Sequence, residues 1–351
     1  MKILVLWSKP SGYLLSQLKS LYELGVEVHL FVQSNESEAP FKFQNEFAFL
    51  SSFRFVDQVN DKLLFKLVND VDANVILICS WNNPAYLRIA RHFRVIRILF
   101  MDNQWRRTLK QVIGVSLRRI IIRPHFDGVL LPGARQEIFA KYLGFKPAQI
   151  AAMGYSADVN RFLTVRPSPR NRTFLYVGRL VKEKGLDLLL NGYESYRSAR
   201  KNPWELRIVG SGMLKEELIE RRIPGVHIEE FIQPALLPYE YARSSCFVLA
   251  SLFEPWGLVL HEAAASGLPI ISSDASGSAD VFVEHGVNGF VFKSGKVLEL
   301  TNAMVQLHDL SDSEWEQMSR SSQTKAELIT PKTWATSLVN LVSEIQKIKA
   351  S

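Results

Sequence analysis

The chain has 351 residues, too many for one ordinary core, so its length predicts two domains. Its composition, 47% hydrophobic and 22% charged, is typical of a globular protein. Two cysteines, Cys79 and Cys246, lie in apolar runs, which excludes a disulfide framework and favours a reducing compartment. No apolar run reaches the roughly 18 residues of a membrane span, and the first run is too short for a signal peptide.

The net charge of +7 is concentrated in the first part of the chain. Residues 1–165 hold 21 Lys and Arg against 13 Asp and Glu, or +8, whereas the remainder holds 21 against 22, or −1. The densest segment is 106–123, and no acidic residue occurs between Asp102 and Asp127. Its six cations are Arg106, Arg107, Lys110, Arg118, Arg119 and Arg123.

Short apolar runs of strand length alternate with helix-like segments along the chain. They predict strands at 2–7, 26–32, 74–79, 95–101 and 127–133, then at 173–178, 206–212, 226–232, 246–251, 268–273 and 288–292. Helices are expected at 13–25, 84–93, 134–144, 185–200, 214–222, 257–267 and 333–350. The runs show little polar alternation, as in strands buried on both faces of a parallel sheet. The pattern predicts an α/β protein with two Rossmann-like, doubly wound sheets.

One segment, RFLTVRPSPRNRTF at 161–174, has the proline and arginine content of an exposed connector. We therefore expect a first domain over 1–165, a second over 166–330 and a last helix within 331–351. Two such domains joined by a hinge leave a cleft, and ligands bind outside the carboxyl ends of the strands. Candidate site residues should therefore follow strands.

The segment YVGRLVKEKG follows an expected strand. Gly178 allows a tight turn, and Arg179 and Lys184 precede a helix start. Unpaired amides and two cations suit a diphosphate. A solvated loop with two ordinary surface cations is the alternative.

A second turn, VGSG, places Gly210 and Gly212 after a strand and before a helix. Glycines let a backbone approach a nucleotide closely. A plain tight turn explains them equally well.

The segment FEPWGLVLHEA contains two carboxylates, Glu254 in a loop and Glu262 inside a helix. Burying a lone carboxylate is costly, so both need partners, and sugar or ribose hydroxyls can donate to them. The amides of Trp256, Gly257 and Leu258 can hold sugar or phosphate. The alternative makes Glu254 a helix cap and Glu262 a surface residue.

Taken in order, these motifs resemble the nucleotide-sugar domain of GT-B glycosyltransferases, and glycosyltransferase family 4 (group 1) in particular. The resemblance covers residues 172–292. It implies two domains facing a cleft, with the first binding the acceptor and the last helix packing back towards it. It also implies transfer with retention at the anomeric carbon and without a metal or other cofactor. The sequence agrees with the absence of a metal, because it shows no His/Asp cluster suited to Mg²⁺ or Mn²⁺.

The resemblance also implies roles for individual residues. Arg179 and Lys184 match the cations that hold the donor diphosphate and stabilise it as it leaves. Glu254 matches the residue at the transferred sugar, and Glu262 the one that binds the ribose.

The turn at Gly257 and Leu258 matches the amides that meet the sugar or phosphate. Phe231 and Ile232, within EFIQPALL, occupy the place of the base contacts.

The first domain departs from the family pattern. Its first loop, WSKPSGYLL, offers Gly12 in place of a glycine pair. Asp102 or Asn103 stands where the family has a histidine. Asp102 therefore orients a hydroxyl, balances positive charge on the donor side, or simply caps the next helix.

The basic segment 106–123 has three interpretations. It is an ordinary solvated face, a membrane-surface patch or a nucleic-acid site. No base-reading motif supports the last, whereas cations beside apolar residues favour an anionic membrane surface.

We therefore predict a glycosyltransferase for polysaccharide biosynthesis, with a nucleotide-sugar donor and a glycan or lipid-linked acceptor. Its expected place is the cytoplasm or the inner face of the membrane. A non-catalytic sugar-nucleotide-binding subunit and a GT-B epimerase are the rivals. Base, sugar, acceptor, linkage and oligomeric state are not indicated by the sequence.

Overall fold

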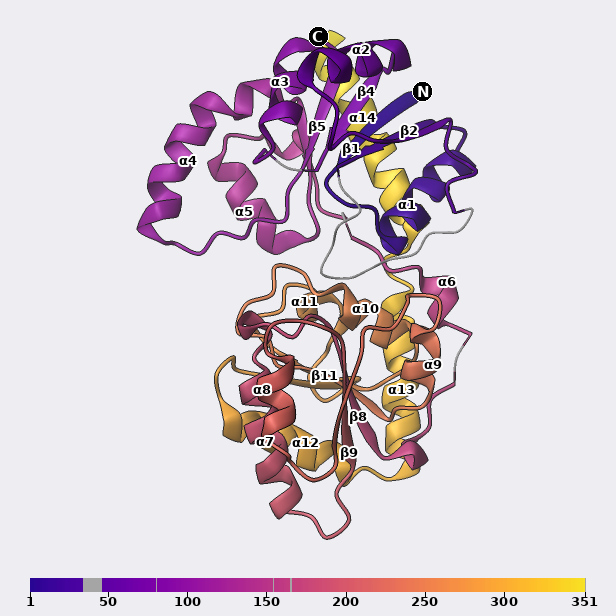
Figure 1. The fold of residues 1–351 in the computed structure, drawn as a ribbon, viewed down its shortest axis with the longest axis vertical. Helices are drawn as coiled ribbons and strands as arrows, with labels where there is room; N and C mark the ends of the chain where they lie inside the picture. Colours follow the sequence, from indigo (N-terminus) through magenta and orange to yellow (C-terminus); the bar gives the residue numbers. More distant parts are fainter. Residues whose placement is uncertain (34–45, 80, 154, 165, 351) are drawn as a thin grey trace. The chain divides into compact units, whose positions relative to one another are not determined.

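The computed structural model describes residues 1–33, 46–79, 81–153, 155–164 and 166–350. The chain forms two compact units (Figure 1). Unit 1 comprises Met1–Ser156 with Pro331–Ser351, and unit 2 comprises Ala157–Thr330. The division falls before residues 157–165, which the sequence analysis assigned to the first domain. These residues include a short helix, α6 (Val159–Phe162), whose Phe162 ring lies 5.4 Å from that of Tyr241 in unit 2.

Within the described residues, unit 1 is built on a seven-stranded parallel sheet in the order β3-β2-β1-β4-β5-β6-β7. Its strands are β1 (Lys2–Trp7), β2 (Glu27–Val32), β3 (Ser52–Phe55), β4 (Val75–Ile78), β5 (Ile96–Phe100), β6 (Gly128–Leu130) and β7 (Ile150–Ala151). Its helices are α1 (Gly12–Glu23), α2 (Asp61–Val71), α3 (Pro84–His92), α4 (Leu109–Ile121), α5 (Ala134–Tyr142) and α14 (Pro331–Ala350), with 3-10 turns η1 (Arg123–His125) and η2 (Pro147–Gln149).

Helices cover both faces of this sheet, which is why most residues of its central strands β1, β4 and β5 are apolar. On one face, α1 and α14 pack together with Leu18 and Trp334 fully buried, and Figure 1 shows the two helices side by side. On the other face, α2, α3 and α5 bury Leu64, Ile89 and Phe139. Loops follow the carboxyl ends of the strands.

A buried ion pair joins β5 to the turn before β6. Arg97 Nε donates to Asp127 Oδ2 at 3.1 Å, and the Arg97 backbone N–H donates to the same oxygen at 2.8 Å. Lys349 Nζ of α14 lies 2.9 Å from Asp127 Oδ1. Burial raises the pKa of Asp127, but hydrogen bonds from Arg97 and Lys349 outweigh it and lower that pKa overall. The ionised carboxylate therefore stabilises unit 1 at neutral pH.

Replacing this carboxylate, as Asp127→Asn, is expected to lower the free energy of unfolding by about 2 kcal/mol at neutral pH, because Arg97 keeps an acceptor but loses its counter-charge. Since the folded-state pKa is depressed, the stabilisation is lost as pH falls through it, and the two proteins should converge in acid. Urea unfolding of both proteins at neutral and acidic pH measures this. Asp57→Asn, at an exposed position of unit 1, is the control. A difference that persists unchanged in acid would contradict the assignment.

Within the described residues, unit 2 is built on a six-stranded parallel sheet in the order β10-β9-β8-β11-β12-β13. Its strands are β8 (Thr173–Val177), β9 (Glu205–Val209), β10 (Val226–Glu229), β11 (Cys246–Leu249), β12 (Ile270–Ser273) and β13 (Gly289–Phe292). Its helices, besides α6, are α7 (Leu186–Ser198), α8 (Lys215–Glu220), α9 (Leu237–Ala242), α10 (Leu258–Ala265), α11 (Ala279–Phe282), α12 (Val297–His308) and α13 (Asp312–Ala326), with turns η3 (Pro169–Asn171) and η4 (Lys182–Lys184).

Both sheets are doubly wound, as the sequence predicts. The chain winds outward from β8 to β10, then returns to β11 on the other side of β8. The switch point therefore lies between β8 and β11, and doubly wound sheets bind ligands at the carboxyl ends of the strands at such a point.

Candidate functional site

Four loops of unit 2 meet at the carboxyl edge of its sheet. They comprise residues 178–185 after β8, 210–214 after β9, 250–257 after β11 and 274–278 after β12. We call this region the carboxyl-edge site. Two of the loops, those after β8 and β11, border the switch point.

The first two loops pack directly on one another through their glycines. The N–H of Leu180 donates to the carbonyl of Ser211 at 2.7 Å. A Cβ at Gly210 would lie 1.9 Å from the Gly178 carbonyl oxygen, and one at Gly212 would lie 2.4 Å from that of Leu180. Both glycines of VGSG are therefore required by packing between loops, and α8 begins only at Lys215. The tight-turn interpretation accounts for them.

Lys184 and Glu254 form an ion pair across the switch point. Lys184 ends η4 after β8, Glu254 follows β11, and Lys184 Nζ contacts Glu254 Oε2. Their side chains are 14% and 11% exposed. The N–H of Leu252 also donates to the Glu183 carbonyl at 2.9 Å, so backbone and side chains together join the two loops. An ammonium and a carboxylate are thus fixed side by side where a ligand is expected.

The loop that carries Glu254 is held by the loop after β12. The N–H of Glu254 donates to the Ala275 carbonyl at 3.2 Å, and the N–H of Gly277 donates back to the Glu254 carbonyl at 3.0 Å. Ser278 Oγ donates to the Gly257 carbonyl at 2.7 Å. These bonds hold the backbone of the loop from which the Glu254 side chain projects.

Two helices of unit 2, α7 and α10, begin at this edge. Gly185 precedes α7 with φ 65°, and Gly257 precedes α10 with φ 90°. In the part of the chain that the structure describes, no side chain caps either helix. Because Gly257 occupies the cap position of α10, the alternative that Glu254 caps this helix is wrong. Uncapped helix starts present N–H groups and partial positive charge to an anion.

Glu262 lies at the start of the second turn of α10 and faces α9. The Tyr241 hydroxyl donates to Glu262 Oε2 at 2.8 Å. Burial raises the pKa of Glu262 to about 7, although the Tyr241 hydrogen bond and the Arg161 charge oppose it. Its carboxyl group therefore titrates near neutral pH, and the alternative of a plain surface residue is wrong.

Comparison with known proteins shows which family the domain containing this site resembles. Residues 171–309 match the family model described as glycosyl transferases group 1. The chain carries a glycosyltransferase group 1 domain. An uncharacterized glycosyltransferase of Haemophilus influenzae is 35% identical over 141 residues, which are 38% of this chain and 38% of that protein. The amylovoran biosynthesis glycosyltransferase AmsD of Erwinia amylovora is 34% identical over 142 residues, 39% of each chain. The matches thus span about two fifths of these relatives.

Solved structures extend the similarity to the whole fold. Anabaena HepE in complex with UDP and glucose has a TM-score of 0.72 and 18% identity, covering 98% of this chain and 99% of its own. Sucrose-phosphate synthase from Thermosynechococcus elongatus has a TM-score of 0.77 and 16% identity, covering 100% of both. The chain therefore has the GT-B fold, as its sequence predicts.

The remaining predicted residues of the group 1 domain follow its strands or lie at the start of α10. Arg179 is exposed in the loop after β8, and its carbonyl accepts from the Tyr176 hydroxyl at 2.8 Å. Phe231 and Ile232 are half-buried after β10, the strand at the edge of the sheet. Trp256 and Gly257 are buried beside Glu254, and Leu258 starts α10. Sequence reasoning missed Tyr241, which lies on α9 and has no motif of its own.

Two predicted residues lie in unit 1, at carboxyl ends of its strands. Gly12 starts α1, and Ser11 caps that helix by accepting from the N–H of Leu14 at 3.4 Å. Asp102 is exposed after β5. The cap of α4 is Thr108, so the alternative that Asp102 caps the next helix is wrong.

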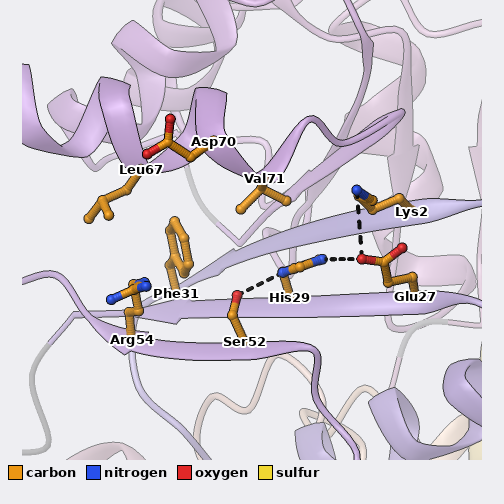
Figure 2. Close-up of a pocket in the computed structure, with 9 residues that line it drawn as sticks. All are labelled: Lys2, Glu27, His29, Phe31, Ser52, Arg54, Leu67, Asp70 and Val71. Atoms are coloured by element: carbon orange, nitrogen blue, oxygen red, sulfur yellow. Dashed lines mark hydrogen bonds and ion pairs between the residues drawn. The ribbon is translucent and has the colours of Figure 1, made fainter.

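A hollow in unit 1 lies at the opposite end of its sheet. Figure 2 shows His29 between Glu27 and Ser52, with Nε2 3.0 Å from Glu27 Oε1 and Nδ1 2.7 Å from Ser52 Oγ. Lys2, Glu27 and Ser52 are the first residues of their strands, so the hollow is at the amino end. Doubly wound sheets bind ligands at the other end, and the hollow is therefore not the candidate site.

Two features are absent from the residues that the structure describes. No group of three or more His, Cys, Asp or Glu side chains there has the arrangement of a metal site. No described helix has the length and apolarity needed to cross a bilayer.

Proposed function

We propose that the protein is a retaining, metal-independent glycosyltransferase that moves a sugar from a nucleotide-diphosphate donor to a glycan or lipid-linked acceptor. The observation that carries the proposal is the Lys184–Glu254 pair. It lies at the switch point of a group 1 domain, beside two uncapped helix starts.

The diphosphate would be held by positive charge. Lys184 and Arg179 follow β8, and the first amides of α7 and α10 begin at the same edge. Breaking the bond between sugar and diphosphate leaves growing negative charge on the phosphate oxygens. Fixed cations and helix dipoles aimed at that charge lower the barrier without a metal.

The two carboxylates would hold hydroxyl groups. Glu254 pairs with Lys184, so a bound donor exchanges this contact for a phosphate at Lys184 and a sugar hydroxyl at Glu254. Glu262, held by Tyr241, would accept from the ribose, with Phe231 and Ile232 near the base. In unit 1, we assign Gly12 to the donor side and Asp102 to orienting a hydroxyl.

The identity of the nucleotide base in the donor can be tested directly. Because HepE is a UDP complex of the same fold, we expect UDP to raise the melting temperature more than GDP, ADP or CDP. A ligand at 100 times its dissociation constant stabilises by about 2.7 kcal/mol, which thermal shift resolves. Failure of all four to stabilise the protein would contradict the proposed donor class.

Turnover is tested separately. The release of UDP from UDP-sugars is measured with and without acceptor extracts, and this release reports catalysis. Binding with no turnover under any condition would favour the non-catalytic subunit instead.

A further inference from the structure

Helix α4 presents its apolar side chains outward. All of its residues are described, and of these only Val115 is buried. Leu109, Ile113 and Ile120 are 82%, 71% and 75% exposed. A helix that connects two parallel strands ordinarily buries its apolar stripe on the sheet. Here the sheet faces are covered by other helices, and α4 lies at the outer margin of unit 1 (Figure 1).

Specific contacts hold α4 in this orientation. Val115 enters the core of unit 1, and the Arg118 guanidinium lies 5.4 Å from the Trp81 ring centroid. Gln111 Nε2 donates to the Gln104 carbonyl at 2.7 Å, and its Oε1 accepts from the N–H of Arg106 at 2.6 Å. The inward face is thus one valine, polar groups and a cation. These contacts hold α4 so that its apolar face points away from the core of unit 1.

The outward face is continuous and bordered by positive charge. Helical periodicity aligns the exposed residues Leu109, Ile113, Leu117 and Ile120 in one stripe. The stripe is widened on its two sides by Val112 and Ile121, with Lys110 along one border and Arg119 along the other.

Arg106 and Arg107, both exposed, precede the helix. No acid occurs between Asp102 and Asp127. Apolar side chains flanked by cations fit the boundary between acyl chains and anionic headgroups. We propose that α4 docks this protein on an anionic bilayer, with its apolar stripe inserted at the headgroup boundary.

Sedimentation with vesicles tests the proposal. The full chain is mixed with vesicles of phosphatidylcholine alone, or of phosphatidylcholine with an equal part of phosphatidylglycerol. We expect binding to the anionic vesicles only, weakened by added salt. The charge variant Arg106→Gln, Arg107→Gln, Lys110→Gln should lose roughly 100-fold in affinity, and the apolar variant Ile113→Ser, Ile120→Ser at least roughly tenfold.

Matched controls remove the same groups elsewhere on unit 1. Lys19→Gln, Lys62→Gln, Lys66→Gln is the charge control, and Leu24→Ser, Leu63→Ser the apolar control. Both should bind like the parent. Circular dichroism and UDP stabilisation show whether each variant is folded, and their outcome is independent of docking.

Three results would overturn the proposal. They are no binding to anionic vesicles, equal losses in the control variants, and a concentration-dependent dimer that the apolar variant abolishes while vesicle binding persists. The last result would assign this face to a second copy of the chain.

Discussion

Lys184→Met is expected to slow sugar transfer by roughly 100- to 1,000-fold, the loss usual when one fixed group that stabilises developing charge is removed. The Lys184 side chain is only 14% exposed at the switch point, and its ion pair with Glu254 already orients it. Methionine keeps the length of the side chain but cannot stabilise the leaving phosphate. Steady-state rates with saturating donor measure the effect on the chemical step. The control is Lys182→Met, in the same 3-10 turn but exposed.

Stability must be separated from catalysis in this experiment. Lys184→Met alone leaves Glu254 buried without its partner and should cost about 3 kcal/mol of unfolding free energy. The double variant Lys184→Met, Glu254→Gln removes both charges and should recover most of that stability, but not the rate. A double variant that regained activity along with stability would show that the pair only holds two loops together.

The sequence determined the fold in outline because its strands carry their own signal. β1 and β8 are continuous apolar runs, and the predicted positions overlap the observed strands. β3 was missed because it lies at the sheet edge, where half-buried residues leave no apolar run.

Helix α13 was missed for a different reason. It is mostly polar and buries Trp315 and Met318 on one narrow face. A signal was present, however, because Ser311 and Glu314 form a capping box.

The site was predictable as a set of loops but not as a set of contacts. Motifs placed Lys184 and Glu254 after strands, yet 70 positions separate them, and only the strand order brings them together. Tyr241 and Glu262 are likewise brought together only by the fold, because they come from different helices. For Gly210 the motif was visible in the sequence, but close packing on Gly178 explains the glycine without a ligand.

His261 is a helix histidine packed in the interior of unit 2. It is fully buried in α10, and its ring stacks on Phe282 at a centroid distance of 4.1 Å. Nδ1 accepts from the N–H of Ala157 at 3.0 Å, so the other nitrogen carries the proton and Nε2 donates to the Ala326 carbonyl at 2.9 Å. The neutral ring thus ties α10 to two distant segments of unit 2.

This arrangement predicts acid sensitivity of unit 2. Burial lowers the pKa of His261 from 6.5 to about 4. The unfolded chain therefore binds a proton at a pH where the folded chain does not, and stability falls as pH falls through this window. The full loss is about 3 kcal/mol, from the size of the shift. Glu262 acts in the opposite direction, because burial raises its pKa to about 7 and its contribution declines as pH rises.

The variant His261→Leu separates the pH dependence caused by His261 from the opposite pH dependence caused by Glu262. At neutral pH it should destabilise the protein by about 2 to 3 kcal/mol, because two buried hydrogen bonds lose their partner. Leucine does not titrate, so the gap between variant and parent should close as pH falls from 6.5 to about 4. Urea unfolding across this range measures the gap, with the half-exposed His227→Gln as control. Parallel stability curves would mean that His261 is already protonated in the folded protein, and that the neutral ring bridging Ala157 and Ala326 is not the form present.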